Sequence, residues 1–305
     1  MNILIAGGSG FIGQALAKYL NSKGYKLFLL TRHKFKQGTD FHETLYWDGS
    51  HFECDMPFDA IINLCGENIA AKRWSKKQKE KLLSSRIIST RALQLYLRKQ
   101  MAVLYANRKP PILLNASAVG FYTDSGSNQD EQNYIQNSTP NFTQKLVLAW
   151  EKEATNCRKC GVTVSCLRFG VVLDKSGGML KKMLPSFKMG LGAIMGNGKS
   201  HLSWIHIEDL CRAVNHILAQ TEIKEAYNLT SPMPCSQEEF STQLSQAIGV
   251  ARFLKIPPWL IKIIFGEMGE TLMLSDQRIV PAQLKKSGFK FYYPDIQTAL
   301  LQITG

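Results

Sequence analysis

The stretch "NILIAGGSGFIG", Asn2 to Gly13, decides the fold, because an apolar run ends in glycines that lead straight into a helix. Gly7, Gly10 and Gly13 form a G-x-x-G-x-x-G frame between a strand predicted at 3–6 and a helix predicted at 11–23. In such a frame the chain turns tightly, its backbone approaches a diphosphate, and the helix packs close to the strand. The helix N-terminus then faces negative charge, so the stretch predicts a dinucleotide site.

The turn supplies the first predicted contacts with this dinucleotide. Besides the three glycines they are the residues between them, Ser9, Phe11 and Ile12. A later strand, predicted at 60–64, ends at "NLCG" and should border the adenosine half. There Leu64 and Cys65 are expected to contact the cofactor, and Gly66 lets the backbone pass close.

The end of the second predicted strand indicates which dinucleotide is bound. An NAD site normally carries an acidic residue about 20 positions after the glycines, bonded to the ribose 2′-hydroxyl. Here the strand ends at "LLTRHK", with Thr31 and then Arg32. No carboxylate repels a 2′-phosphate, and a guanidinium grips one with two hydrogen bonds. The sequence therefore predicts NADP(H) rather than NAD(H).

One further cation is a candidate for the same site. Arg86 lies on the helix predicted at 75–99. It either turns back toward the phosphates or pairs with a carboxylate at the surface, and both interpretations stay open.

Strands alternate with helices through the first 174 residues. The strands are predicted at 3–6, 27–30, 44–47, 60–64, 112–116 and 162–168, and the helices at 11–23, 75–99 and 142–156. Continuous apolar strands between helices indicate a parallel sheet covered on both faces. The expected fold class is α/β, with a Rossmann-type doubly wound parallel sheet in a cofactor-binding domain at 1–174.

After residue 174 the pattern changes. The Gly- and Met-rich segment at 176–205 predicts loops and short helices draped over the carboxyl edge of the sheet. Helices are expected near 207–220, 236–248, 259–273 and 294–302. Residues 175–305 thus form a smaller, mostly helical region on the substrate side, and a return of part of it to the sheet stays open.

The net charge of +13 raises the question of nucleic-acid binding. The densest basic run is "KRWSKKQKEKLLSSR" at 72–86, where Ser75 and Gln78 predict a helix-start capping box and four apolar residues, Leu82, Leu83, Ile87 and Ile88, an apolar stripe. The lysines then fall mainly on the solvent-facing side of the predicted helix. A solvated surface is the expected interpretation, with no specific nucleic-acid partner; affinity for a small anion or a general polyanion is the alternative.

The cysteines and the hydropathy exclude several classes of protein. Seven cysteines without framework spacing, including one lone C-x-x-C at Cys157 and Cys160, predict reduced thiols, no metal site and a cytoplasmic chain. The chain enters a strand directly after Met1, and no apolar run reaches about 18 residues. Neither a signal peptide nor a membrane partner is expected, and a homodimer stays open.

Several motifs in order carry a resemblance to a known family: "GGSGFIG", "INLCGENI", "KRWSKKQKEKLLSSR", "LRFGVVLD" and "SWIHIEDL". The chain resembles an atypical, extended-type short-chain dehydrogenase/reductase. More narrowly it resembles the NAD-dependent epimerase/dehydratase branch, also labelled the cell-division-inhibitor-like epimerase family. The similarity covers essentially the whole chain, including the closing module at 266–296. It implies a Rossmann-type domain, NADP(H) and an oxidoreductase or epimerase, without naming a substrate.

The resemblance also implies a catalytic serine, tyrosine and lysine, and here the chain departs from it. In most of the superfamily the serine polarises the substrate oxygen, the tyrosine transfers the proton, and a lysine four residues later lowers the tyrosine pKa. Ser117 fits the serine at the end of the fifth predicted strand, or else caps backbone there. Phe142 and Leu146 stand where the tyrosine and lysine are expected.

The nearest substitute acid is Tyr122, in "NASAVGFYTDSG". An unassisted phenol has a pKa of about 10, so it donates a proton at neutral pH but accepts one poorly. Tyr122 is therefore the candidate proton donor in a carbonyl reduction. The alternative is a loop aromatic that packs on substrate or core.

Three other residues stand in motifs near the predicted site: His206, Arg168 and Val171. In "SWIHIEDL" we expect His206 to cap the following helix rather than to catalyse. In "LRFGVV" we expect Arg168 to be structural and the backbone of Val171 to lie close to the nicotinamide.

Two classes of function follow. The first is an NADP(H)-dependent oxidoreductase or epimerase, acting on a small polar carbonyl, alcohol or nucleotide-sugar-like substrate. The second is a non-catalytic NADP(H)-binding protein that senses redox state or scaffolds a partner, and the missing lysine favours it.

Overall fold

The computed structural model describes residues 1–32, 40–133, 139–251 and 254–305. Within them one large sheet has the strand order β11-β6-β5-β4-β1-β2-β3, and all its neighbouring strands pair in parallel. Its strands are β1 (Asn2–Ala6), β2 (Lys26–Thr31), β3 (Glu43–Tyr46), β4 (Ala60–Asn63), β5 (Ile112–Ala118), β6 (Thr163–Phe169) and β11 (Ala226–Leu229). The predicted doubly wound α/β fold is confirmed.

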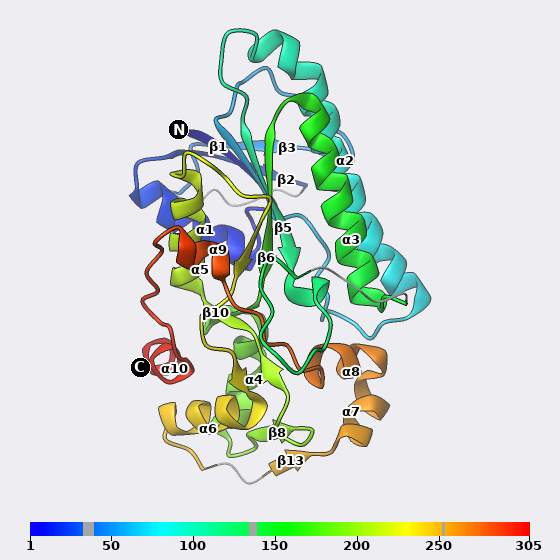
Figure 1. Ribbon diagram of the computed structural model, residues 1–305, viewed down its shortest axis with the longest axis vertical. Coiled ribbons are helices and arrows are strands. Elements are labelled where there is room, and N and C mark those ends of the chain that lie inside the picture. The colour runs from blue at the N-terminus through cyan, green and yellow to red at the C-terminus, as the bar shows by residue number, and fades with distance from the viewer. Residues whose placement is uncertain (33–39, 134–138, 252–253) are drawn as a thin grey trace.

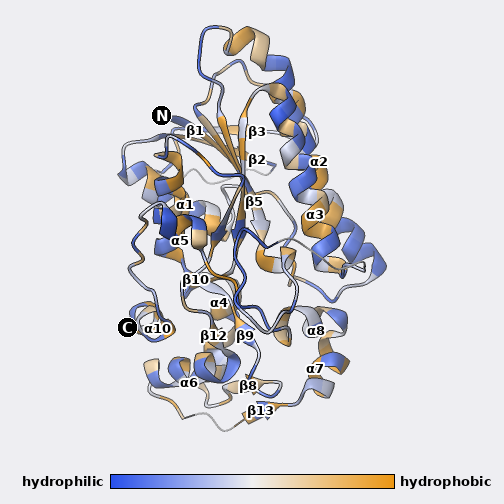
Figure 2. Ribbon diagram, in the orientation of Figure 1, coloured by the Kyte–Doolittle hydropathy of each residue, from blue (hydrophilic) through white to orange (hydrophobic). Residues whose placement is uncertain are grey.

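Helices cover both faces of this sheet, as Figure 1 shows. One face carries α1 (Phe11–Ser22), α5 (Ile207–Leu218) and α9 (Ala282–Lys286), and the other carries α2 (Lys76–Leu104) and α3 (Phe142–Thr155). Successive strand residues point to opposite faces, so Ile3 and Ile5 enter the first core while Leu4 and Ala6 enter the second. Figure 2 shows the resulting concentration of hydrophobic residues along the central strands.

The lysine-rich helix α2 begins as expected but packs differently. The Ser75 hydroxyl accepts a hydrogen bond from the Gln78 backbone N–H, which confirms half of the capping box; the other half is absent because the Ser75 backbone N–H donates to the Arg73 carbonyl. Leu82 is buried, but Leu83 and Ile88 of the predicted apolar stripe are exposed. The lysines of the run lie largely toward solvent.

The chain beyond residue 174 returns to the sheet. β7 (Val171–Asp174) pairs with β10 (Trp204–His206), α5 packs against α1, and β11 extends the sheet beside β6. A second, smaller core lies below, with α4 (Gly178–Lys188), α6 (Gln237–Ala247) and α10 (Ile296–Thr304) around it. Two short strand pairs complete this region: β8 (Ala193–Met195) with β13 (Leu254–Ile256), and β9 (His201–Leu202) with β12 (Cys235–Ser236).

The single helix predicted at 259–273 is wrong. The structure has two helices, α7 (Pro258–Phe265) and α8 (Glu267–Met273), broken at Gly266. Gly266 has φ +59°, and a Cβ there would lie 2.9 Å from Nε of Arg73. A glycine adopts this left-handed conformation without strain, so the chain turns sharply and α8 faces the Rossmann part of the molecule (Figure 1).

Candidate cofactor and substrate site

A cavity of about 610 Å³ runs along the carboxyl ends of the central strands. Open parallel sheets bind ligands at this edge. Of the predicted site residues, those that line the cavity are Gly7, Gly10, Phe11, Ile12, Gly13, Leu64, Cys65, Gly66, Arg86, Ser117 and Val171. Ser9, Thr31, Arg32 and Tyr122 are not part of its wall.

The glycine turn brings the backbone close together, as the motif requires. Gly7 has φ +77°, and a Cβ there would lie 3.0 Å from the carbonyl carbon of Leu64. A Cβ at Gly13 would lie 2.5 Å from the Cα of Gly8. Because no larger side chain fits, the strand ends and the first turn of α1 form a wall of exposed backbone. Such a wall fits a diphosphate.

Thr31 and Arg32 flank the cavity at the end of β2. Thr31 is buried and Arg32 is exposed. The charge of Arg32 acts on Cys65 in the cavity wall: burial raises the pKa of the Cys65 thiol to about 12, while Arg32 opposes the rise. Arg32 thus lies within electrostatic range of Cys65, and its side chain runs past Gly49.

Arg86 is not a surface ion-pair partner. Its side chain is buried, with 8% of the residue exposed, and its guanidinium carbon stacks 4.8 Å from the ring centre of Trp150. Nη1 donates to the Leu82 carbonyl at 2.9 Å, but Nε has no partner. Burial lowers the pKa of Arg86 to about 10, so the group stays charged at neutral pH. A buried cation with an unsatisfied donor in the cavity wall fits an anionic ligand group.

Ser117 belongs to a buried ionic network. Its hydroxyl donates to Oε1 of Glu151 at 2.6 Å. Glu151 also accepts two hydrogen bonds from Arg168, at 2.8 and 2.9 Å. The Ser117 hydroxyl proton is therefore committed to the carboxylate, which leaves the oxygen lone pairs for other contacts. Arg168 is structural, as expected.

Sequence reasoning missed Glu151, although a signal exists. The parallel register of β5 and β6 places Ser117 opposite Arg168. A buried arginine needs a carboxylate partner, and Glu151 follows Trp150 on the helix that covers these strands. Only the packing of α3 shows that this glutamate, rather than Glu153, supplies it.

The candidate proton donor Tyr122 belongs to the wall of a second cavity, described below, and its hydroxyl is hydrogen-bonded within the protein. Tyr122 is 3% exposed and packs with Phe121, Val147 and Ile279. Its hydroxyl donates to Oδ1 of Asn228 at 2.7 Å and accepts from Nη1 of Arg168 at 2.9 Å. Burial raises the pKa of the phenol to about 12. Because both hydrogen bonds of the hydroxyl are taken by protein groups, the geometry favours the alternative, a loop aromatic that packs on substrate or core.

The position of the missing lysine is apolar in three dimensions. Leu146, Val147 and Trp150 of α3 form a hydrophobic strip of the cavity wall. Phe142 lies away from the cavity, against Trp74 at 4.9 Å between ring centres. No ammonium group stands beside Ser117 on this helix in the cavity wall.

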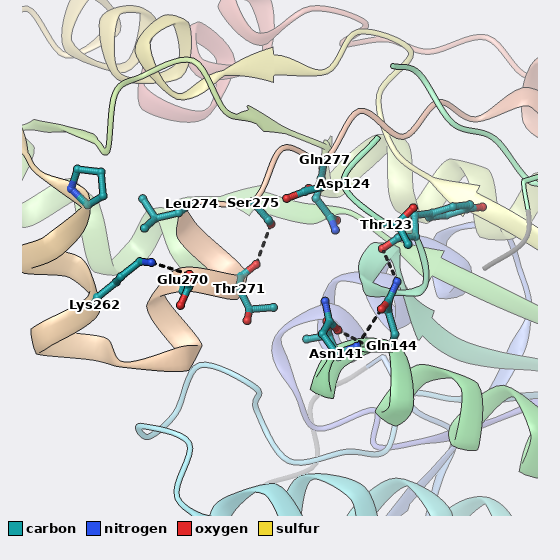
Figure 3. A pocket seen from close by; sticks show the side chains of 13 residues that line it. Thr123, Asp124, Asn141, Gln144, Lys262, Glu270, Thr271, Leu274, Ser275 and Gln277 are labelled. Carbon is teal, nitrogen blue, oxygen red and sulfur yellow. Dashed lines mark hydrogen bonds and ion pairs between the residues drawn. The ribbon is translucent and has the colours of Figure 1, made fainter. Parts of the chain in front are cut away.

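A second cavity, of about 520 Å³, adjoins the first and shares Thr143, Thr271, Ser275 and Gln277 with it. Figure 3 shows its polar wall, drawn from the loop after β5, the start of α3 and the helices α7 and α8. Its charged members are Asp124, Lys262 and Glu270, and Lys262 pairs with Glu270 at 2.6 Å. Burial raises the pKa of Asp124 above its usual range.

His206 is a helix cap, as predicted. Its ring nitrogen Nδ1 accepts a hydrogen bond from the Glu208 backbone N–H at the start of α5. The Asp209 carboxylate accepts hydrogen bonds from the backbone N–H groups of Tyr292 and Tyr293, and it forms an ion pair with Arg212 at 2.6 Å. His206 also contacts Gln302, and Glu208 accepts from the Tyr293 hydroxyl, so all three side chains hold the C-terminal segment in place.

Two findings concern metals and membranes. Among residues 1–32, 40–133, 139–251 and 254–305, no group of three or more potential ligand residues is placed to hold a metal ion. In the same part of the chain, no helix is both long and apolar enough to traverse a bilayer.

Comparison with known proteins places the chain in a family. The NAD dependent epimerase/dehydratase family matches residues 3–230, and a domain of unknown function, DUF1731, matches residues 256–303. Epimerase family protein Mb2239 of Mycobacterium bovis is 34% identical over 302 residues, 98% of this chain and 96% of that protein. YfhF of Bacillus subtilis is 32% identical over 309 residues, 99% and 98% of the two chains.

A solved structure shares the whole architecture. The crystal structure of human epimerase family protein SDR39U1 with NADPH has a TM-score of 0.87 and 29% sequence identity, and it covers 100% of this chain and 99% of that chain. The parallel sheet and the glycine-walled cavity define a Rossmann-type nucleotide-binding protein. The chain belongs to the NAD dependent epimerase/dehydratase family, which confirms the resemblance in the sequence.

Proposed function

We propose that the chain is an NADP(H)-dependent oxidoreductase or epimerase that binds the cofactor in the long cavity and a small polar substrate in the adjoining one. The observation that carries the proposal is the continuity of the two cavities through Thr143, Thr271, Ser275 and Gln277. A ligand in the polar cavity would therefore adjoin a ligand in the cofactor cavity, whose wall includes Ser117. When bound, NADPH would supply a hydride to a carbonyl carbon.

The chain's own residues would hold the cofactor at three places. The backbone wall at Gly7–Gly13 and the N-terminus of α1 would face the diphosphate. The exposed guanidinium of Arg32 would bind the 2′-phosphate. Arg86 would satisfy its free Nε on an anionic or carbonyl group deeper in the cavity. The SDR39U1 structure with NADPH supports the choice of NADP(H).

The second cavity favours an uncharged or cationic polar substrate over a nucleotide diphosphate. Its one lysine is already paired with Glu270, and Asp124 adds negative charge. A diphosphate would find no unpaired cation among these lining residues. Hydroxyl and amide groups from Thr123, Asn141 and Gln144 are suited to a polyol or carbonyl compound.

The test is a screen of NADPH oxidation, followed at 340 nm, against small aldehydes, ketones, quinones and nucleotide-sugars. We expect turnover with uncharged polar carbonyls and little with nucleotide-sugars. Calorimetry of NADPH and NADH binding is run on the same protein. NADPH binding without turnover across the whole panel would support the second candidate, a non-catalytic cofactor-binding protein. That candidate is favoured because the Ser117 hydroxyl already donates to Glu151 and because Tyr122 is buried.

A further inference from the structure

His201 and Asp276 form a pair in the wall of the cofactor cavity. His201 opens β9, and Asp276 follows α8, 75 residues later in the chain. The Asp276 carboxylate accepts a hydrogen bond from the His201 backbone N–H at 2.7 Å and lies 2.9 Å from ring nitrogen Nδ1. His201 lines the same cavity as Ser117 and Val171, with 27% of its side chain exposed.

Asp276 fixes the orientation of the imidazole. Burial acts to raise the pKa of Asp276, but hydrogen bonds from Arg278 and His201 bring it below its usual value, so the group is a carboxylate at neutral pH. Arg278 holds the other carboxylate oxygen at 3.0 Å. A carboxylate at Nδ1 places the Nδ1 proton and leaves Nε2 for other contacts. Nε2 has no hydrogen-bond partner among the described residues.

The other titratable groups among the described residues of the cavity wall are Cys65, Glu67 and Arg86. Burial raises the pKa of Cys65 to about 12 and Arg86 stays charged. Glu67 pairs with Lys81 at 3.0 Å. An imidazole, in contrast, changes its charge between about pH 5 and 8. His201 is the one histidine among the described residues that line this cavity.

Charged groups around His201 come from three segments. Asp276 and Arg278 lie on the segment after α8, and Asp124 interacts with Asp276 from the loop after β5. On the third side, Glu238 at the start of α6 packs on the loop that leads into β9, where its backbone N–H bonds the Gly198 carbonyl.

We propose that His201, oriented by Asp276, is the general acid of this site; the inference rests on the proposed reductase function. The substrate carbonyl carbon accepts the hydride, and the C=O π electrons move to the oxygen. That oxygen takes the proton from Nε2–H of the imidazolium. The products are the alcohol, NADP⁺ and a neutral His201, which regains its proton from solvent. In the reverse direction the neutral imidazole accepts the alcohol proton.

Chemical rescue tests the role directly. With a carbonyl from the panel that the unmutated protein reduces, His201→Ala should lower turnover by about 10²–10⁴-fold while NADPH affinity holds within threefold. Added imidazole should restore turnover in proportion to the imidazolium concentration. His201→Gln, which fills more of the space, should not be rescued. His51→Gln, an exposed histidine outside both cavities, is the matched control and should keep full turnover.

A second measurement needs no turnover. The His201 ring is titrated by NMR in the cofactor-free protein and assigned by the signal lost in His201→Gln. In Asp276→Asn the midpoint should move to lower pH, because the imidazolium loses its anionic partner. An unchanged midpoint would show that Asp276 does not hold the ring, and the proposed pair would be withdrawn.

The outcomes separate the two proposals. Turnover in the unmutated protein that persists undiminished in His201→Ala overturns the role of His201 and leaves the reductase function standing. NADPH binding with no turnover on any panel compound overturns both. Loss of turnover in His201→Ala without imidazole rescue assigns the residue to structure and also overturns the general-acid role.

Discussion

Ser117 and Glu151 share a short hydrogen bond, 2.6 Å from hydroxyl to carboxylate, between the end of β5 and the helix α3 that covers it. The same carboxylate holds Arg168 by two further bonds. The expected catalytic serine is therefore also part of the internal ionic structure of the fold. Its position is fixed by a charge pair, and its proton is donated to Glu151 rather than to a ligand in the cavity.

Removal of this carboxylate should destabilise the protein. Glu151→Ala leaves the guanidinium of Arg168 buried without an anion, with 7% of its side chain exposed. Breaking one side of a buried pair costs about 3–5 kcal/mol of unfolding free energy. Urea denaturation measures the loss. Glu153→Ala on the same helix is the matched control: its partner Arg91 is 59% exposed, so the cost should stay below about 1 kcal/mol. Equal losses in the two variants would contradict the buried-pair interpretation.

Arg32 should decide the choice of cofactor. NADPH is expected to bind at least tenfold more tightly than NADH, about 1.4 kcal/mol, because a guanidinium binds the 2′-phosphate. Arg32→Asp should reverse that order, since a carboxylate repels the phosphate and accepts a ribose hydroxyl. Calorimetry at fixed ionic strength measures both affinities. Equal affinities in the unmutated protein would remove Arg32 from cofactor selection.

Arg86 should contribute to binding and not to stability. Arg86→Met keeps an unbranched side chain against Trp150 and removes a buried charge that, among the described residues, has no carboxylate in ion-pair contact and only a longer-range attraction to Glu67. NADPH affinity should fall about tenfold to a hundredfold, the range of one charge-assisted hydrogen bond. The thermal midpoint of the cofactor-free protein should not fall, because an unpaired buried charge is costly. Unchanged affinity, or a midpoint lowered by several degrees, would show instead that the guanidinium serves the fold.

Tyr122→Phe should act on stability and not on chemistry. The variant leaves Asn228 Oδ1 without its donor at a buried site, at a cost of about 1–3 kcal/mol. NADPH affinity and any turnover should change by less than about threefold. A selective hundredfold loss of turnover, with stability retained, would restore the phenol as an acid.

The pH dependence of stability gives a second signature of Tyr122. Burial raises its pKa to about 12 in the folded protein, against about 10 in the unfolded chain. The folded state therefore favours the neutral phenol, and that stabilisation is present below pH 10 and lost as the pH rises toward 12. Denaturation curves of Tyr122→Phe should show a smaller decline over this window than those of the unmutated protein. Parallel declines would indicate that the phenol does not titrate there.

The cofactor half of the site was predictable because its signals are local. A strand, a glycine turn and a helix start are contiguous in the chain, so Gly7, Gly10 and Gly13 specify the backbone wall without reference to distant residues. The strands follow from continuous apolar runs, and the β5–β6 register follows from those strands. Helix ends were predictable for the same reason, as the caps at Ser75 and His206 show.

The break between α7 and α8 at Gly266 could not be predicted from the sequence pattern. The apolar sequence at 258–265 and the following turn of helix-forming residues favour one continuous helix. A glycine inside such a pattern lowers helix stability by only about 1 kcal/mol, so the sequence alone does not end the helix there. The close approach of Arg73 to Gly266, from a segment nearly two hundred residues earlier, accompanies the sharp turn.

The sequence by itself determined the α/β fold, the dinucleotide cradle and the family, because these depend on residues adjacent along the chain. Tertiary structure alone decided the partners of the polar side chains. Glu151 meets Ser117 across 34 positions, Asp276 meets His201 across 75, and Asn228 meets Tyr122 across 106. A buried polar group needs a partner, but nothing in its local sequence says which distant residue supplies it. For that reason nothing in the sequence indicated that Asn228 and Arg168 hold the Tyr122 hydroxyl, and packing alone brought His201 to the cavity wall.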